Sequence, residues 1–296
     1  MIRPAREDDL PGLLALHRRV FGRALSAQER RWKLADQPSP VPNVWVAEVD
    51  GRVVFQFAGI PVRVQHRGRQ RWAMQSVDTM ADPEHRRRGL LTETALLTFE
   101  QWKRAGVAFV FGLPNQNWRS RLAALGFVAL GEARWWVRWL SPLRRLAGTV
   151  TLLDDPAPID GLWAGTADEG LVKDAAWYRW RYLAAPRPFQ LIGAHGAGRL
   201  AGVAAFRCDG ASAIVAEVQT AGLDTARDLL KAACRAAAAG GARRAALLVH
   251  SGTQLEQAAL AAGFVPRPHS FPIVAADLAG GLPRAALFQG GDFDVV

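Results

Sequence analysis

Hydrophobic and polar positions follow two different periods along the chain, and together they predict a mixed α/β fold. Apolar residues at two-residue spacing indicate strands, and apolar residues three or four positions apart indicate amphipathic helices. In the first half, strands are predicted at 2–4, 44–49, 53–64, 71–80 and 107–111 and helices at 11–21, 26–32, 90–105 and 115–125. The unbroken apolar run at 107–111 is typical of a strand buried on both faces.

Turn and cap signals support these boundaries. Asp50-Gly51 lies between two apolar runs and predicts a hairpin. Asp8 or Asp9 is expected to cap the helix at 11–21, and Ser26 and Glu29 have the spacing of a capping box.

The second half repeats the order of the first. Strands are predicted at 189–192, 200–207, 213–219 and 244–249, and helices at 224–239 and 253–262. A local match accompanies this order, since 122–128 reads Leu-Ala-Ala-Leu-Gly-Phe-Val and 259–265 reads Ala-Leu-Ala-Ala-Gly-Phe-Val. A repeat this long indicates a duplicated domain rather than a solenoid. We therefore expect two tandem domains, residues 1–146 and residues 147–296.

Two aromatic segments interrupt the pattern. The tryptophan-rich stretch at 135–149 is read as the last strand of the first domain followed by a linker. Aromatic and arginine residues alternate at 174–182, an arrangement that can stack nucleic-acid bases. Packing as an amphipathic helix or strand between the two halves is the preferred interpretation.

Composition adds a basic surface to this picture. The 296 residues include 37 Lys and Arg against 27 Asp and Glu, a net charge of +10, which suits nucleic acid, a membrane face or an anionic cofactor without choosing among them. We expect a cytoplasmic protein with no membrane span, because the first ten residues do not resemble a signal or transit peptide and no apolar run reaches about 18 residues. The six histidines lack paired metal-ligand spacing, so no metal is predicted.

The strongest chemical signal is the basic turn between the strand at 71–80 and the helix at 90–105. It reads Arg86-Arg-Arg-Gly-Leu-Leu-Thr92. The first amides of a helix have no intrahelical partner, and the helix dipole favours negative charge there. Gly89 permits close approach to the backbone. The turn therefore predicts a phosphate site, although three arginines can also simply solvate a helix start.

Several separated motifs make the chain resemble the GNAT acyltransferase superfamily. Arg86 and Gly89 occupy the first two positions of that family's cofactor signature, while Leu91 departs from its last position. The stretch 77–86, the sequence Gly112-Leu-Pro-Asn115 and Leu125-Gly-Phe127 are similar to further signatures of one subgroup. The resemblance covers about residues 1–140.

This resemblance implies that the two strands flanking the turn splay apart and hold the pantetheine arm of acyl-CoA between them. Backbone N–H groups near Met80 and Ala81 are then implied to bond the arm and polarise the thioester, and those of the turn to hold the diphosphate. The implied cofactor-binding residues are Met80, Ala81, Arg86, Arg87, Arg88, Gly89, Leu90, Leu91, Thr92, Asn115 and Asn117.

The catalytic groups are less defined. Asp78 is the first candidate for the general base, with a structural carboxylate as the alternative, and Glu93 is weaker. Many family members carry a tyrosine that protonates the leaving thiolate, but Leu122 stands at that position here. Ser120 or solvent would take over this role.

The second domain keeps only Gln219 and Gly222 of the signature and places Asp224 at its end, so we expect it to bind no CoA. The resemblance implies an N-acyltransferase that uses acetyl-CoA or another acyl-CoA and a small-molecule or peptide amine. The alternatives are a non-catalytic tandem module, acting as a CoA sensor or scaffold, and an aminoacyl-tRNA-dependent transferase on the same fold.

Overall fold

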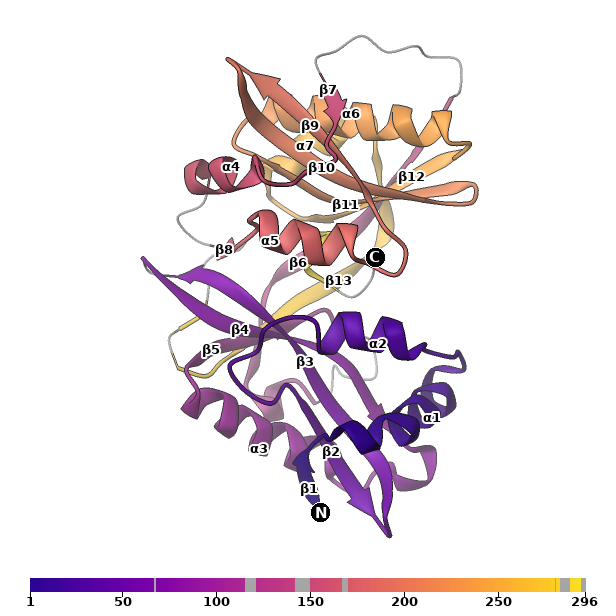
Figure 1. Ribbon diagram of the computed structural model, residues 1–296, viewed down its shortest axis with the longest axis vertical. Helices are drawn as coiled ribbons and strands as arrows, with labels where there is room; N and C mark the ends of the chain where they lie inside the picture. Colours follow the sequence, from indigo (N-terminus) through magenta and orange to yellow (C-terminus); the bar gives the residue numbers. More distant parts are fainter. Residues whose placement is uncertain are drawn as a thin grey trace. The chain divides into compact units, whose positions relative to one another are not determined.

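The computed structural model describes residues 1–66, 68–114, 121–141, 150–166, 170–279, 281–282 and 288–293. The chain forms two compact units, which are interleaved in sequence (Figure 1). Unit 1 comprises Met1–Leu130 and Val274–Arg284, and unit 2 comprises Gly131–Ile273 and Ala285–Val296. The boundary between 146 and 147 stays a prediction about the duplication.

The sheet of unit 1 is built on a central pair of parallel strands. Its first four strands pair as antiparallel neighbours in chain order, the fourth pairs in parallel with the fifth, and the end of the strand β13 adds to the far side of the fifth. The strands are β1 (Ile2–Pro4), β2 (Val44–Val49), β3 (Arg52–His66), β4 (Arg69–Ala81), β5 (Val107–Gly112) and β13 (Val265–Asp277). The part of β13 that belongs to unit 1 pairs from Val274 opposite Gly112 to Asp277 opposite Phe109. The sequence pattern did not predict this strand.

Helices cover both faces of the unit 1 sheet (Figure 1). The helix α1 (Leu10–Phe21) packs Leu13 and Leu16 against Val46, Val53 and Met80. The helix α3 (Leu90–Arg104) packs on the opposite face, where its apolar side chains meet those of β3, β4 and β5. A third, short helix, α2 (Ala27–Leu34), follows α1.

The predicted caps of the first two helices differ in outcome. Ser26 caps α2, since its Oγ accepts a hydrogen bond of 2.9 Å from the amide of Glu29. Asp9 is the N-cap residue of α1, but the prediction that its side chain caps the helix is wrong. Its carboxylate instead accepts from the Arg3 guanidinium at 2.7 and 2.8 Å and from the amide of Arg6 at 2.7 Å. The stronger, charge-assisted bonds to Arg3 turn the carboxylate away from the helix amides.

An aromatic cluster forms the core between α3 and the sheet. The ring of Phe57 lies 5.6 Å from Phe99 and 5.8 Å from Trp102, and Phe127 lies 5.9 Å from Phe99. The buried indole of Trp102 donates a hydrogen bond of 2.9 Å to the carbonyl of Pro42, which ties the segment before β2 to the core. This cluster fixes α3, and therefore its N-terminal turn, relative to the strands.

Unit 2 has the same arrangement as unit 1. Three antiparallel strands are followed by a helix and by a strand parallel to the third of them, and a further antiparallel strand completes the sheet. The elements are β9 (Gln190–Gly196), β10 (Arg199–Asp209), β11 (Ser212–Thr220), α6 (Leu223–Ala239), β12 (Arg244–His250), α7 (Gln254–Ala261) and β6 (Phe127–Trp139), with β7 (Val150–Leu152) on the outer edge of β9. Ahead of β9 lie α4 (Ile159–Thr166), β8 (Gly170–Leu171) and α5 (Ala175–Tyr178), the last of which continues as a π-helical turn over Arg179–Leu183. The predicted fold class, a mixed α/β sheet, is confirmed, and the tandem arrangement stays a prediction.

The predicted helix at 115–125 is wrong over the part of it that the structure describes. A turn at 121–122 leads into a 3₁₀ helix over Ala123–Leu125, which ends at Gly126 with φ of +73°. Residues 115–120 lie outside the described residues. Among the helices that the structure describes, we find none with the length and apolar character needed to cross a membrane.

The packing of Trp102 against β3 generates a stability prediction. A Cβ at Gly59 would lie 2.8 Å from Cη2 of Trp102 and 3.2 Å from Cβ of Met74, so Gly59→Ala overpacks a rigid region. We expect this change to lower the free energy of unfolding by about 1–3 kcal/mol, measured by denaturant unfolding. The control is Gly12→Ala in α1, where the nearest atoms are 3.9 Å from the new Cβ. Equal stability of the two variants would contradict the packing described here.

Candidate functional site

The parallel strands β4 and β5 stop pairing before β4 ends. Their pairing runs from Trp72 opposite Val107 to Gln75 opposite Phe111. They are still adjacent one residue later, because a Cβ at Gly112 would lie 3.6 Å from the carbonyl oxygen of Ser76. β5 ends there, whereas β4 continues to Ala81 along β3. Backbone groups of 77–81 that point away from β3 therefore form an open strand edge, which an extended ligand can bond.

A β-bulge lies within this open stretch of β4. The register passes from Ala58 opposite Val77 to Gln56 opposite Met80, so Asp78 and Thr79 together oppose one residue of β3. Asp78 takes the left-handed conformation with φ of +43°. Bulges of this kind redirect the strand and its side chains and are frequent beside active sites. Here the bulge lies between the end of the β4–β5 pairing and the turn that leads into α3.

Asp82 fixes the turn that follows β4. Its amide donates to the carbonyl of Val54 at 2.8 Å, and its buried carboxylate accepts from the amide of Glu84 at 3.1 Å and from Nε of Arg19 at 3.1 Å. Burial raises the pKa of Asp82, but the Glu84 amide and the Arg19 charge outweigh it, and the pKa is lowered overall. An ionised Asp82 thus ties the turn to both β3 and α1.

The turn then presents a row of backbone amides at the start of α3. Arg87 and Gly89 both adopt positive φ, +64° and +79°. Gly89 is the N-cap residue of α3, and no side chain caps the helix there. The first hydrogen bond within the helix runs from the amide of Glu93 to the carbonyl of Gly89, at 3.1 Å. Among the described residues, no acceptor bonds the amides of 86–92.

The surroundings of this turn fit an anion. Arg86, Arg87, Arg88 and Gly89 are all exposed, and a Cβ built at Gly89 meets no atom within 4 Å. Arg86 folds back toward the strand, with its Nε 3.3 Å from the carbonyl of Ala81. Free amides at a helix N-terminus, open space and three cations form an arrangement that binds phosphate.

The structure therefore brings together the first group of predicted residues. Met80 and Ala81 end β4, Arg86 to Gly89 form the turn, and Leu90, Leu91 and Thr92 are the first residues of α3. The side chain of Met80 is fully buried beneath α1, so only its backbone can serve a ligand. Asn115, Asn117 and Ser120 lie outside the described residues, and their roles stay predictions.

Asp78, the candidate base, is engaged in an ion pair that the sequence pattern did not reveal. Its Oδ2 lies 2.7 Å from Nζ of Lys33 in α2, and the two side chains are only 8% and 4% exposed. The pair fastens α2 to the bulge of β4. Because the ion pair joins two elements, this geometry favours the structural role for Asp78. The weaker candidate, Glu93, is exposed in the first turn of α3, and Leu122 packs against the aromatic core.

Unit 2 repeats this geometry but fills it. β11 and β12 pair only from Ser212 opposite Arg244 to Val215 opposite Leu247, while β11 continues to Thr220, and its pairing with β10 is shifted by a bulge. At the open edge, Gln289 takes both backbone groups of Val218: its Oε1 accepts from the amide at 2.7 Å and its Nε2 donates to the carbonyl at 2.8 Å. The cavity that remains beside Val218 and Gly222 measures about 50 Å³, enough for only a few water molecules.

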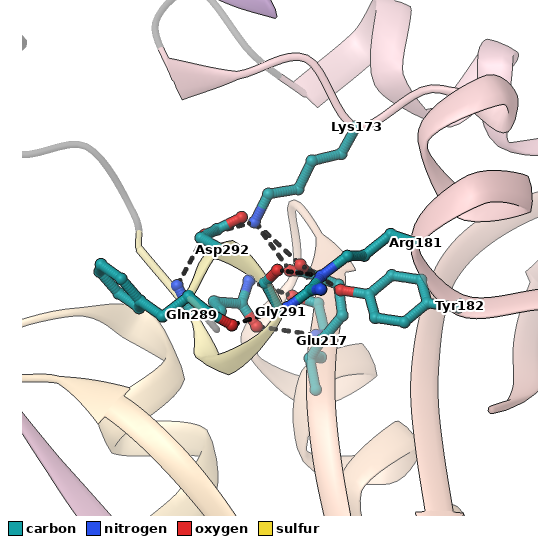
Figure 2. Close-up of polar contacts among 9 residues, drawn as sticks. Lys173, Arg181, Tyr182, Glu217, Gln289, Gly291 and Asp292 are labelled. Carbon is teal, nitrogen blue, oxygen red and sulfur yellow. Dashed lines mark hydrogen bonds and ion pairs between the residues drawn. The ribbon is translucent and has the colours of Figure 1, made fainter. Parts of the chain in front are cut away.

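A buried charge network holds this C-terminal segment in place (Figure 2). Nζ of Lys173 lies 2.9 Å from Oε2 of Glu217 and 2.8 Å from Oδ2 of Asp292, and the Tyr182 hydroxyl donates to Glu217 at 3.0 Å. Arg181 donates to the carbonyls of Gly291 and Phe293 at 2.8 and 2.6 Å. The sequence pattern missed this network, because its members are far apart along the chain.

Comparisons with known proteins agree with this geometry. Residues 1–119 match the family model described as the acetyltransferase (GNAT) domain. A search of curated proteins finds no match.

Solved structures match nearly the whole chain. A conserved protein of unknown function from Enterococcus faecalis V583 and a GCN5-related N-acetyltransferase from Anabaena variabilis each have a TM-score of 0.71, with 14% and 12% sequence identity. Each match covers 94% of this chain and 72% of the other. A protein from Pyrococcus horikoshii has a TM-score of 0.66 at 13% identity, and the match covers 97% of this chain and 94% of that one. At these identities the matches establish the fold.

The buried network of unit 2 makes stability depend on pH. Burial raises the pKa of Glu217 from 4.5 to about 7, with Asp292 adding to this effect and Lys173 opposing it. A raised pKa means that the folded state holds the proton more tightly, so this contribution is full below pH 4.5 and is lost as pH rises to about 7. We expect Glu217→Gln to flatten the decline in unfolding free energy between pH 5 and about 8, measured by denaturant unfolding at each pH. The exposed Glu132→Gln is the control, and equal slopes in the two variants would contradict the prediction.

Proposed function

Since residues 1–119 belong to the GNAT acetyltransferase superfamily, we propose that the chain is an N-acyltransferase. Unit 1 binds acyl-CoA and passes its acyl group, acetyl by default, to the amine of a small molecule or peptide. The observation that carries this proposal is the row of amides at 86–92, for which the described residues provide no acceptor. They lie beside the point where β4 extends past the end of its pairing with β5.

Different groups of unit 1 bind different parts of acyl-CoA. The amides from Arg86 to Leu91 and the three arginine side chains hold the diphosphate, and the Thr92 hydroxyl offers a further donor. The open edge at the end of β4 bonds the extended pantetheine arm. Backbone N–H groups near Met80 and Ala81 polarise the thioester carbonyl and stabilise the negative charge that develops on its oxygen.

Acyl-CoA supplies a thioester, which a neutral amine can attack directly. The C–N bond forms, the C–S bond breaks, and the amine loses one proton while the thiolate is free to take one up. Because Asp78 is ion-paired with Lys33, we assign the amine proton to water at the open end of the site, with Asp78 holding α2 in place. Leu122 cannot protonate the thiolate, so Ser120 or water does so, and a thiolate leaves readily even unassisted because a thiol is a much stronger acid than an alcohol.

Unit 2 contributes structure rather than a second cofactor site in this proposal. The backbone of Val218 is bonded to Gln289, and Asp224 follows the N-cap Gly222 where phosphate would approach. Both features support the prediction that this copy binds no CoA.

Charge reversal in the turn tests the proposal. We expect Arg86→Glu to weaken CoA binding at least about tenfold, because it replaces a cation beside the diphosphate with an anion, and calorimetry with CoA measures this. The control is Arg104→Glu at the other end of α3, where the side chain is 68% exposed and pairs with Glu100. An Arg86→Glu variant that binds CoA as tightly as the control would refute the phosphate role of the turn.

One observation favours a second function, a CoA-binding module without turnover. Leu122 packs into the aromatic core at the position where the related enzymes carry an acidic hydroxyl. Release of free thiol from acetyl-CoA over a broad amine panel separates the two functions. Thiol release that depends on the amine supports the enzyme, and tight CoA binding with no amine-dependent release supports the module.

A further inference from the structure

An open cleft of about 1030 Å³ lies in unit 1, and its lining is distinct from the basic turn at 86–92. Its walls are the start of α1 with the segment before it, one side of α2 with the two residues after it, and the segment leading into β2. Apolar side chains line part of it, and polar groups line the rest; those that matter here are Leu10, Leu13, Leu34, Arg30, Arg31 and Asp36. The cleft can therefore hold a small molecule with an apolar body.

The charges around this cleft do not cancel. Arg6, Arg30 and Arg31 face Glu7 and Asp36. Nε of Arg31 lies 3.1 Å from Asp36, which neutralises that pair at the surface, and Arg6 and Glu7 are neighbours exposed at the rim. Arg30 is the cation that is left over.

Arg30 is buried, and one nitrogen of its guanidinium lacks a hydrogen-bond partner in the part of the chain that the structure describes. The residue is only 7% exposed, and its Nη1 is buried with no hydrogen-bond acceptor among the described residues. Burial lowers the pKa of this guanidinium, and the attraction of Asp78 opposes that effect. No hydrogen bond or ion pair joins Arg30 to Asp78, whose Oδ2 lies 2.7 Å from Nζ of Lys33, about one helical turn further along α2.

An unpaired buried cation costs free energy, and proteins normally provide it with an acceptor. Arg30 is one of the residues that line the cleft, so a ligand bound there can supply the missing acceptor. The same helix also links this cleft to the open end of β4 through Lys33 and the bulge at Asp78.

We propose that Arg30 binds an oxyanion, a carboxylate or a phosphate, on the acyl acceptor, whose apolar body lies against Leu10, Leu13 and Leu34. The acceptor is then an amine that also carries an acidic group. That the ligand of this cleft is the acyl acceptor rests on the proposed function. The oxyanion site itself is inferred from the cleft and the unpaired guanidinium.

Matched ligand pairs test the charge preference. The probes are amino acids and dipeptides with leucine-like side chains, each compared with its C-terminal amide, and phosphoethanolamine compared with ethanolamine, with affinities measured by ligand-observed NMR. We expect at least one acidic probe to bind wild-type protein about tenfold or more tightly than its neutral partner, as for a hydrogen bond to a charged group. Which of the two series shows the preference tells a carboxylate from a phosphate. We expect Arg30→Gln to reduce the ratio to within about twofold and Arg18→Gln, an exposed arginine of α1, to leave it unchanged.

Two results would overturn the proposal. One is a wild-type protein that shows no preference for any acidic probe, and the other is an Arg30→Gln variant that keeps the wild-type preference. Stability provides an independent check, because removal of an unpaired buried cation by Arg30→Met should leave the melting temperature equal or higher. A lower melting temperature would mean that Arg30 is bonded within the protein, contrary to the proposal.

Calorimetry with CoA separates this proposal from the one on which it rests. If the wild-type protein prefers acidic probes but binds no CoA, the acyltransferase assignment fails and the oxyanion site remains. If CoA binds and the acidic probes show no preference, the acceptor proposal alone fails.

Discussion

A helix cannot bond the amides of its own first turn, and that constraint organises unit 1. At the start of α3 the N-cap is a glycine without a side-chain acceptor, and the residues before it carry positive charge and alternate in backbone conformation. The aromatic core around Trp102 fixes the helix, and Asp82 fixes the turn, so these amides are held in place before any ligand arrives. The end of the β4–β5 pairing places an open strand edge beside them. Phosphate at one end and an extended arm at the other are what this arrangement can bond.

The two units show how one architecture can be kept open in one copy and filled in the other. Both have parallel central strands that stop pairing before they end, a bulge next to that point and a glycine at the following N-cap. In unit 2 the chain itself supplies the ligand, because the Gln289 side chain bonds both backbone groups of Val218. Lys173 is paired with both Glu217 and Asp292 in the interior, so removing the lysine would leave two buried carboxylates without this partner. The filled copy is thus bound to its C-terminal segment by interactions that are costly to break.

Local patterns in the sequence predict most of the elements and the phosphate turn. Hairpins, the two parallel strands and the start of α3 depend on residue spacing and on glycine, which are readable from a single chain. The pairing of β13 with β5 joins residues more than 160 positions apart, and nothing in their local pattern specifies the partner. The same applies to Gln289 and Val218. The sequence pattern also does not predict the ion pairs Lys33–Asp78 and Arg3–Asp9. Local capping and strand signals do not show which cation a carboxylate will contact in the folded chain.

Hydrogen–deuterium exchange with and without CoA tests the central claim most directly, because it reads the amides themselves. CoA is expected to slow exchange in peptides covering 86–92 and the end of β4, and to leave exchange in peptides covering 218–224 unchanged. Exchange at 86–92 that is unaffected by saturating CoA, or protection confined to 218–224, would contradict this claim.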